Sequence, residues 1–111
     1  MKQGASWAIV TAWNPGGVPQ PSARNIAAAR ELARAWAGPA GPVVNGEGEW
    51  AEDALLLPAA RLRDAVALGR RFGQAAALFG VGSRAALVWL DRDVGVTRAW
   101  AVRDDPYTGV P

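Results

Sequence analysis

The chain has 111 residues, half of them apolar, and its eleven arginines and single lysine outweigh ten acidic residues by a formal charge of +2. It contains no cysteine and no histidine, which excludes disulfides, thiolate or imidazole metal sites, cysteine nucleophiles and Ser-His triads. We expect no cofactor and no metal; a metal, if present, would be a hard cation held by oxygen. This length favours one domain, over residues 1–103, with 104–111 (DDPYTGVP) as a flexible tail.

Charge and hydropathy also bear on partners and location. A charge of +2 does not by itself predict nucleic-acid binding, and the excess of arginine over lysine is typical of a thermophile-like composition. No stretch reaches the ~18–20 apolar residues of a membrane span. We expect a cytoplasmic protein that does not bind membranes; its partners stay open, and a homodimer is one option.

The first predicted element is a strand over residues 7–13, WAIVTAW. Both of its alternating sets are apolar, with Trp7, Ile9 and Trp13 on one side and alanines and Val10 on the other. A strand covered on both faces is central in its sheet. It ends at NPGG (14–17), where proline removes a ladder donor and the glycines free the chain to bend.

An amphipathic helix is predicted over about 22–37, with Ser22 as its N-cap and a stop at Gly38-Pro39. Residues 40–57 contain two strands, joined through an Asn45-Gly46 turn and an acidic stretch.

A second helix is predicted from Pro58 to about Gly73, where Gly69 and Gly73 allow a close approach to a neighbouring element. Strands follow at 84–90 and 96–102; residues 75–80 are ambiguous between helix and strand, and we favour a strand. The order β-α-β-β-α-β-β-β predicts an α+β two-layer sandwich with a ferredoxin-like core and a C-terminal antiparallel meander.

The segment TAWNPGG (11–17) has two readings. An Asx turn explains Asn14-Pro15 without any function. Alternatively, Thr11 and Asn14 stand at the carboxyl end of a central strand, beside the start of the next helix. Free helix N–H groups, with Arg24 and Asn25, would then hold an anion or a carbonyl there.

Two further segments carry candidate site residues. EGEWAED (47–53) is typical of a solvated hairpin tip and matches no calcium loop, but Glu52 immediately precedes a strand. In GRRFGQ (69–74), Arg70 and Arg71 suit a helix C-terminus, and one of them could instead pair with Glu52 or fork onto an anion. Gln74 would add a donor and an acceptor.

The set TAWNP (11–15), Asn25, WAE (50–52) and GRRFGQ (69–74) resembles a family of small bacterial proteins known only as a domain of unknown function. The resemblance covers roughly residues 8–90. The sequence differs from the family at Ala75, where the family more often has an asparagine. It implies no activity. It implies that the polar positions of a shared site are Asn14, Asn25, Glu52, Arg71 and Gln74.

Three functions stay open, and whether the chain is an enzyme is one of the open questions. The first is a binding or regulatory domain that recognises a small anionic ligand or a protein partner. The second is a small enzyme with Glu52 as base and Arg71 as electrophile. The third is single-stranded nucleic-acid binding by a sheet face that bears Trp89, Trp100, Arg84 and Arg98.

Overall fold

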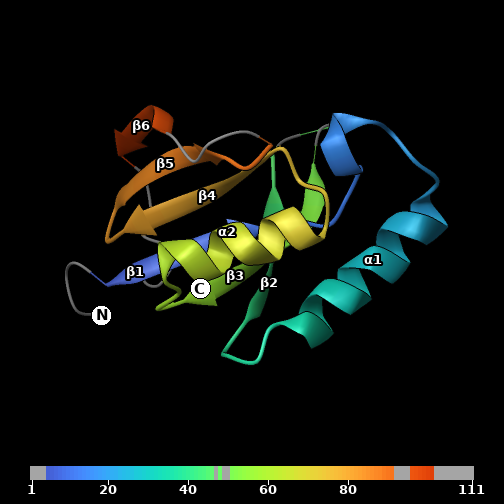
Figure 1. The fold of residues 1–111 in the computed structure, drawn as a ribbon, viewed down its shortest axis with the longest axis horizontal. Coiled ribbons are helices and arrows are strands. Elements are labelled where there is room, and N and C mark those ends of the chain that lie inside the picture. Colours follow the sequence, from blue (N-terminus) through green and yellow to red (C-terminus); the bar gives the residue numbers. More distant parts are fainter. Residues whose placement is uncertain (1–4, 47, 49–50, 92–95, 102–111) are drawn as a thin grey trace.

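The computed structural model describes residues 5–46, 48, 51–91 and 96–101. In chain order the elements are β1 (Ser6–Val10), a short 3-10 turn η1 (Pro15–Gly17), α1 (Ser22–Ala35), β2 (Gly41–Asn45), β3 (Glu52–Pro58), α2 (Leu62–Arg71), β4 (Ala76–Val81), β5 (Arg84–Trp89) and β6 (Val96–Ala101) (Figure 1). The predicted α+β order is confirmed, and the ambiguous segment 75–80 forms a strand.

The strands form one antiparallel sheet in the order β2-β3-β1-β4-β5-β6. The strand β1 lies inside it, paired with β3 on one side and with β4 on the other, so that Ile9 is opposite both Leu56 and Leu78. The prediction that the first strand is central is therefore confirmed. The last three strands form the predicted antiparallel meander.

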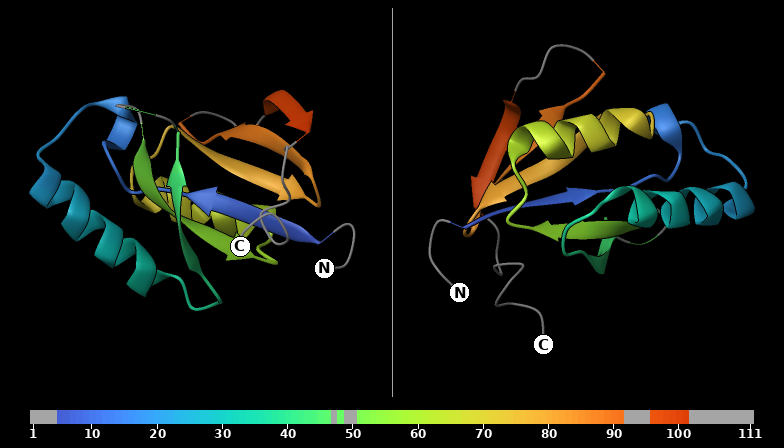
Figure 2. Two further views of the ribbon diagram at one scale, coloured as in Figure 1. Left: turned by 180° about the vertical axis from the view of Figure 1, so that it is seen from behind. Right: turned by 60° about the horizontal axis from the view of Figure 1, so that its bottom comes forward.

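Both helices pack on the same face of this sheet, as Figure 2 shows. The helix α2 lies against β1 and β4, whereas α1 contacts β3. Their shared core includes Ala8, Val10 and Leu57 from the strands and Leu32 and Leu68 from the helices. Burying a side chain such as Leu57, which is fully enclosed, contributes about 1.5–3 kcal/mol.

A second apolar cluster covers part of the opposite face of the sheet. It is built on Trp7, Leu56 and Ala85, with Ile9 and Leu78 packed against it. The Trp7 side chain is only 1% exposed, and its Nε1 donates to the carbonyl of Gly82 at 2.7 Å. The two alternating sets of β1 thus face two different clusters, as their apolar character predicts.

Three predicted boundaries are wrong. The strand β1 stops at Val10. At the next residue the Thr11 side-chain hydroxyl donates to the backbone carbonyl of Asp53 at 2.8 Å. Pro21, not Ser22, precedes the first helical residue of α1. Pro58 ends β3 instead of starting a helix, since Ala59 has a φ of 59° and its N–H bonds the carbonyl of Ser6.

Several predictions fall outside the described residues. These are the flexible tail at 104–111, the acidic residues Glu47 and Glu49, and the side chains of Arg98 and Trp100. Neither helix in the described part of the chain is long and apolar enough to cross a membrane.

The predicted close approach of the second helix is confirmed at Gly69. A Cβ there would overlap the end of the Leu90 side chain, so glycine lets α2 lie this near the sheet without displacing Leu90. Gly73 has a different role: its φ of 69° ends the helix, as glycine commonly does at this position.

Gly80 is the matching close approach on the other face of the sheet. A Cβ at this position would overlap the Trp7 indole and come within 2.7 Å of the Arg84 carbonyl oxygen.

We expect Gly80→Ala to cost about 1–3 kcal/mol and to lower Tm by at least about 4 °C in a thermal melt. Gly41→Ala is the control, because a Cβ there meets nothing within 4 Å; equal melting of the two variants would contradict this packing.

Candidate functional site

The loop that follows β1 is folded against the end of α2. The N–H of Gly16 donates to the carbonyl of Gly73 at 2.8 Å, and Gln74 Nε2 donates to the carbonyl of Trp13 at 3.2 Å. The TAWNP and GRRFGQ segments, about sixty residues apart in the sequence, therefore contact each other directly.

Asn14 is the centre of a hydrogen-bond network at this end of the sheet. Its backbone is left-handed, with φ 45° and ψ 64°. Its Oδ1 accepts from the N–H of Gln20 and from Asn25 Nδ2, both at 3.0 Å, while its Nδ2 donates to Glu52 Oε2 at 3.4 Å. The Asn14 side chain thus joins the linker, the first turn of α1 and the start of β3.

Asn25 and Gln20 complete this network. The Asn25 side chain is 3% exposed, and its Oδ1 accepts from the N–H of Asn14 at 2.9 Å and from Gln20 Nε2 at 2.8 Å. Sequence reasoning missed Gln20, which it assigned to an extended linker. The only available signal was an amide side chain between Pro19 and Pro21.

Gln74 reaches the same region from the end of α2. After the turn at Gly73, the Gln74 N–H bonds back to the carbonyl of Gly69 at 3.0 Å, which fixes the direction of the chain. The side chain is 8% exposed, and its Nε2 donates to the carbonyls of Trp13 and Phe72. Because two carbonyls accept from the nitrogen, the amide orientation is fixed. Its Oε1 has no hydrogen-bond partner in the described part of the chain.

Glu52 is the first residue of β3, paired with Asn45 of β2. Partial burial raises the pKa of its carboxyl above the ordinary value of 4.5, and the hydrogen bond from Asn14 opposes that rise. Among the described residues its side chain makes that one hydrogen bond and no ion pair. Its carboxylate therefore keeps most of its acceptor capacity unused.

Of these residues, Asn14, Glu52 and Gln74 line a cavity of about 210 Å³, whereas Gln20 and Asn25 do not. Its polar wall consists of Thr11, Trp13, Asn14, Asn45, Glu52 and Gln74, and its apolar wall includes Ile9, Leu78 and Leu87 from the sheet face opposite the helices. Sequence reasoning missed two lining residues, Trp13, which it counted as core, and Asn45, which it treated as a turn residue. Buried Trp13 Nε1 lacks a hydrogen-bond acceptor among the described residues.

The structure does not bring Arg71 to this cavity. Its guanidinium lies over the Phe72 ring, 5.9 Å from the centroid, and it lines a different depression with Trp36 and Asp64. Arg70 Nε donates to the carbonyl of Leu90 at 2.9 Å. The predicted ion pair between one of these arginines and Glu52 is not formed, because both side chains stay at the outer surface of α2.

The predicted anion site at the start of α1 stays a prediction, and two N–H groups of that turn are already bonded. The N–H groups of Arg24 and Asn25 both bond to the carbonyl of Pro21, within the helix itself. The Arg24 side chain is exposed, and the Asn25 side chain turns towards Asn14.

The proposed nucleic-acid face can be judged at Arg84 and Trp89 only. These residues lie an odd number of positions apart on β5, so their side chains leave the sheet on opposite faces. The described half of that set therefore does not form one basic aromatic surface.

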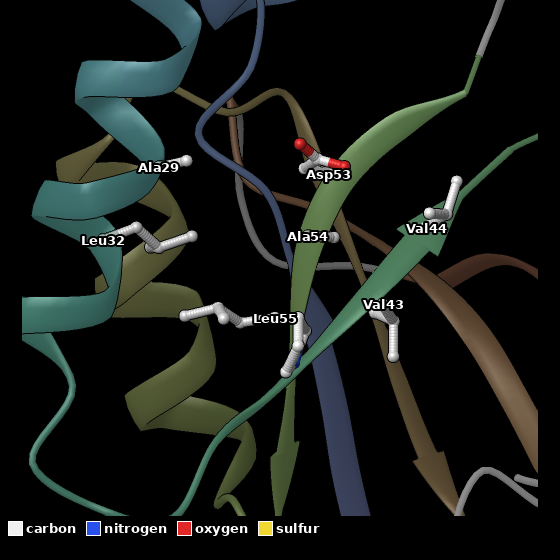
Figure 3. A pocket seen from close by; sticks show the side chains of 8 residues that line it. Ala29, Leu32, Val43, Val44, Asp53, Ala54 and Leu55 are labelled. Carbon is white, nitrogen blue, oxygen red and sulfur yellow. The ribbon is translucent and has the colours of Figure 1, made fainter. Parts of the chain in front are cut away.

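A larger cavity, of about 480 Å³, lies between α1 and the β2-β3 edge of the sheet. Figure 3 shows Ala29 and Leu32 of α1 across from Leu55, with Asp53 as the charged group of the wall. None of the candidate site residues lines it. Among the described residues, no group of three or more acidic side chains could hold a metal ion in either cavity.

The Asn14 network makes a prediction that separates backbone strain from hydrogen bonding. Asn14→Gly keeps the left-handed backbone and loses the bonds to Gln20, Asn25 and Glu52, so we expect a loss of about 1–3 kcal/mol in unfolding free energy. Asn14→Ala should cost about 1 kcal/mol more, because alanine disfavours this conformation. Urea denaturation measures both.

Asn45→Ala is the matched control, since the Asn45 side chain lines the same cavity and makes no hydrogen bond to the described residues. If Asn14→Gly were as stable as the parent chain, the network would contribute nothing to the fold.

Comparison with known proteins gives a match to a protein family. A family model, DUF3293, described as a protein of unknown function, matches residues 10–77, a span that includes the whole Asn14 network. No curated protein and no solved structure matches the chain. Because the match covers more than half of the sequence, the chain belongs to the DUF3293 family.

Proposed function

We propose that this domain is a small-ligand binding module that recognises a hydrogen-bond-donating group through Glu52. The observation that carries the proposal is the state of that carboxylate. It lines the cavity, it is partly desolvated, and it accepts one long hydrogen bond from Asn14 and forms no ion pair among the described residues. A ligand that donates to Glu52 would use acceptor capacity that the fold leaves free.

The rest of the polar set supports a division between wall and binding groups. Asn14, Gln20 and Asn25 largely satisfy one another, which suits a rigid wall. Glu52 and Gln74 Oε1 are the acceptors that this network leaves without sufficient donors. Preorganised polar groups beside an apolar surface are typical of ligand pockets.

The cavity is small. At about 210 Å³ it is smaller than a typical ligand pocket of ~300–1,000 Å³. It would therefore hold the head group of a ligand, packed against Ile9, Leu78 and Leu87 of its apolar wall, while the remainder of a longer ligand would lie outside it.

A donor-bearing ligand replaces the anionic ligand that the sequence suggests. That expectation relied on Arg71 and on the start of α1, and neither contributes a positive group to the lining of the cavity. An anion would instead face the carboxylate of Glu52.

A small enzyme is the second candidate function, and it rests on the same carboxylate. Partial burial raises the pKa of Glu52, which makes it a better general base than an ordinary glutamate. The predicted electrophile, Arg71, is not at the cavity, and no described side chain there takes its place. Binding therefore ranks above catalysis.

We also propose a ferredoxin-like relationship for the core. The order β2-β3-β1-β4, with every pair antiparallel and both helices on one face, supports this assignment. Such sandwiches serve many functions, so the assignment adds nothing to the choice of ligand.

A fragment screen by ¹H–¹⁵N NMR tests the proposed function. Fragments with amine, amide, hydroxyl and carboxylate heads are added to the labelled protein, and the side-chain N–H signals of Asn14, Gln74 and Trp13 report on the cavity. We expect donor-bearing fragments to shift these signals. Glu52→Ala should weaken their binding about 10-fold or more, because a hydrogen bond to a charged group contributes about 1.5–3 kcal/mol.

Glu31→Ala is the control, since Glu31 lies on the exposed face of α1 in an ion pair with Arg34. The proposed function would be contradicted if fragments shift only signals around the larger cavity between α1 and the β2-β3 edge, or if they bind equally well to Glu52→Ala.

A further inference from the structure

We infer that the head group bound in this cavity is a planar delocalised cation, a guanidinium or an amidinium. The inference rests on the proposed function and specifies its ligand. Three features support it: the acceptors that the cavity offers, its charge, and the apolar surface beside them.

The free acceptors are two oxygen-bearing groups from different segments. Gln74 is only 8% exposed. Its amide nitrogen donates to two backbone carbonyls, and its Oε1 has no hydrogen-bond partner among the described residues. Glu52 has one oxygen bonded to Asn14 at 3.4 Å. A head group with several N–H donors has enough donors for both acceptors, whereas a hydroxyl offers a single donor.

The charge of the cavity is negative. Among the described residues the lining contains Glu52 and no arginine or lysine, so the partly buried carboxylate has no counter-ion among them. A bound cation would provide one, and it would also favour the ionised form of Glu52. A neutral donor would leave that negative charge uncompensated.

The apolar surface favours a guanidinium or amidinium over an ammonium. Ile9, Leu78 and Leu87 form one wall, and Trp13 adds an aromatic ring to the lining. A guanidinium is more weakly hydrated than an ammonium, and its planar fork matches both oxygens of a carboxylate. It therefore loses less solvation on entering this cavity and forms more directed bonds to Glu52.

A matched series of butyl compounds tests the inference, because only the head group changes. Butylguanidine, butylamine, butyramide and butyrate are titrated into the labelled protein at pH 7, with the Trp13 and Gln74 side-chain signals as the readout. We expect butylguanidine to bind about 10-fold tighter than butyramide and tighter than butylamine, and butyrate to leave these signals unchanged.

Two variants examine the role of the charge. Glu52→Gln keeps an acceptor and removes the charge, so it should weaken butylguanidine about 10-fold and butyramide by less than about 3-fold. Glu31→Ala, on the exposed face of α1, should change neither. Native-like spectra of both variants establish that they fold.

The source of the head group is resolved by two further probes. Agmatine presents the guanidinium on a free alkyl amine, and N-acetyl-arginine amide presents it as a peptide would. Binding of both, or of either, supports the inference; preference for agmatine identifies a small metabolite, and preference for the capped arginine identifies a peptide.

The failures are distinguishable. If butyramide binds at the cavity as tightly as butylguanidine, or if butylamine does, the inference is overturned while the binding function stands. If no compound of any head group moves the Trp13 and Gln74 signals, the proposed function itself is wrong.

Discussion

The geometry of the cavity depends on the side chain of one residue, Asn14. Its left-handed backbone turns the chain out of β1, and its carboxamide then bonds to the linker, to α1 and to Glu52. Asparagine tolerates this conformation better than most residues and carries both a donor and an acceptor. Glycine would provide only the conformation, and aspartate would place a second negative charge beside Glu52.

The two most distinctive segments of the sequence are parts of one structure. After the turn at Gly73, Gln74 bonds to the carbonyl of Trp13, and the N–H of Gly16 bonds to the carbonyl of Gly73. The end of α2 therefore holds the loop that carries Asn14. The loop after β1 carries an amide and a proline at a corner that joins β1, β3 and both helices. Residues that stabilise the corner also form one wall of the cavity, where the proposed ligand would bind.

The sequence predicted much of this arrangement. The two apolar sides of residues 7–13 implied a central strand, and polar residues at element ends predicted the positions of Asn14, Asn25, Glu52 and Gln74. It could not predict Gln20 or Asn45, because their places depend on the path of loops between elements. Arg71 was expected at the site from its neighbours in GRRFGQ, but successive helix residues point about 100° apart, and it faces away from the sheet end.

The partial burial of Glu52 has a thermodynamic cost. Because its pKa is raised in the folded chain, the folded state binds the proton more tightly than the unfolded state, and its contribution to stability falls as pH rises from about 4.5 through the raised value. The most direct test is a ¹³C NMR titration of the Glu52 carboxyl in the ligand-free protein. A pKa above 4.5 is the expected result; a value at or below 4.5 would mean that the carboxylate is already solvated or paired, and would contradict this account.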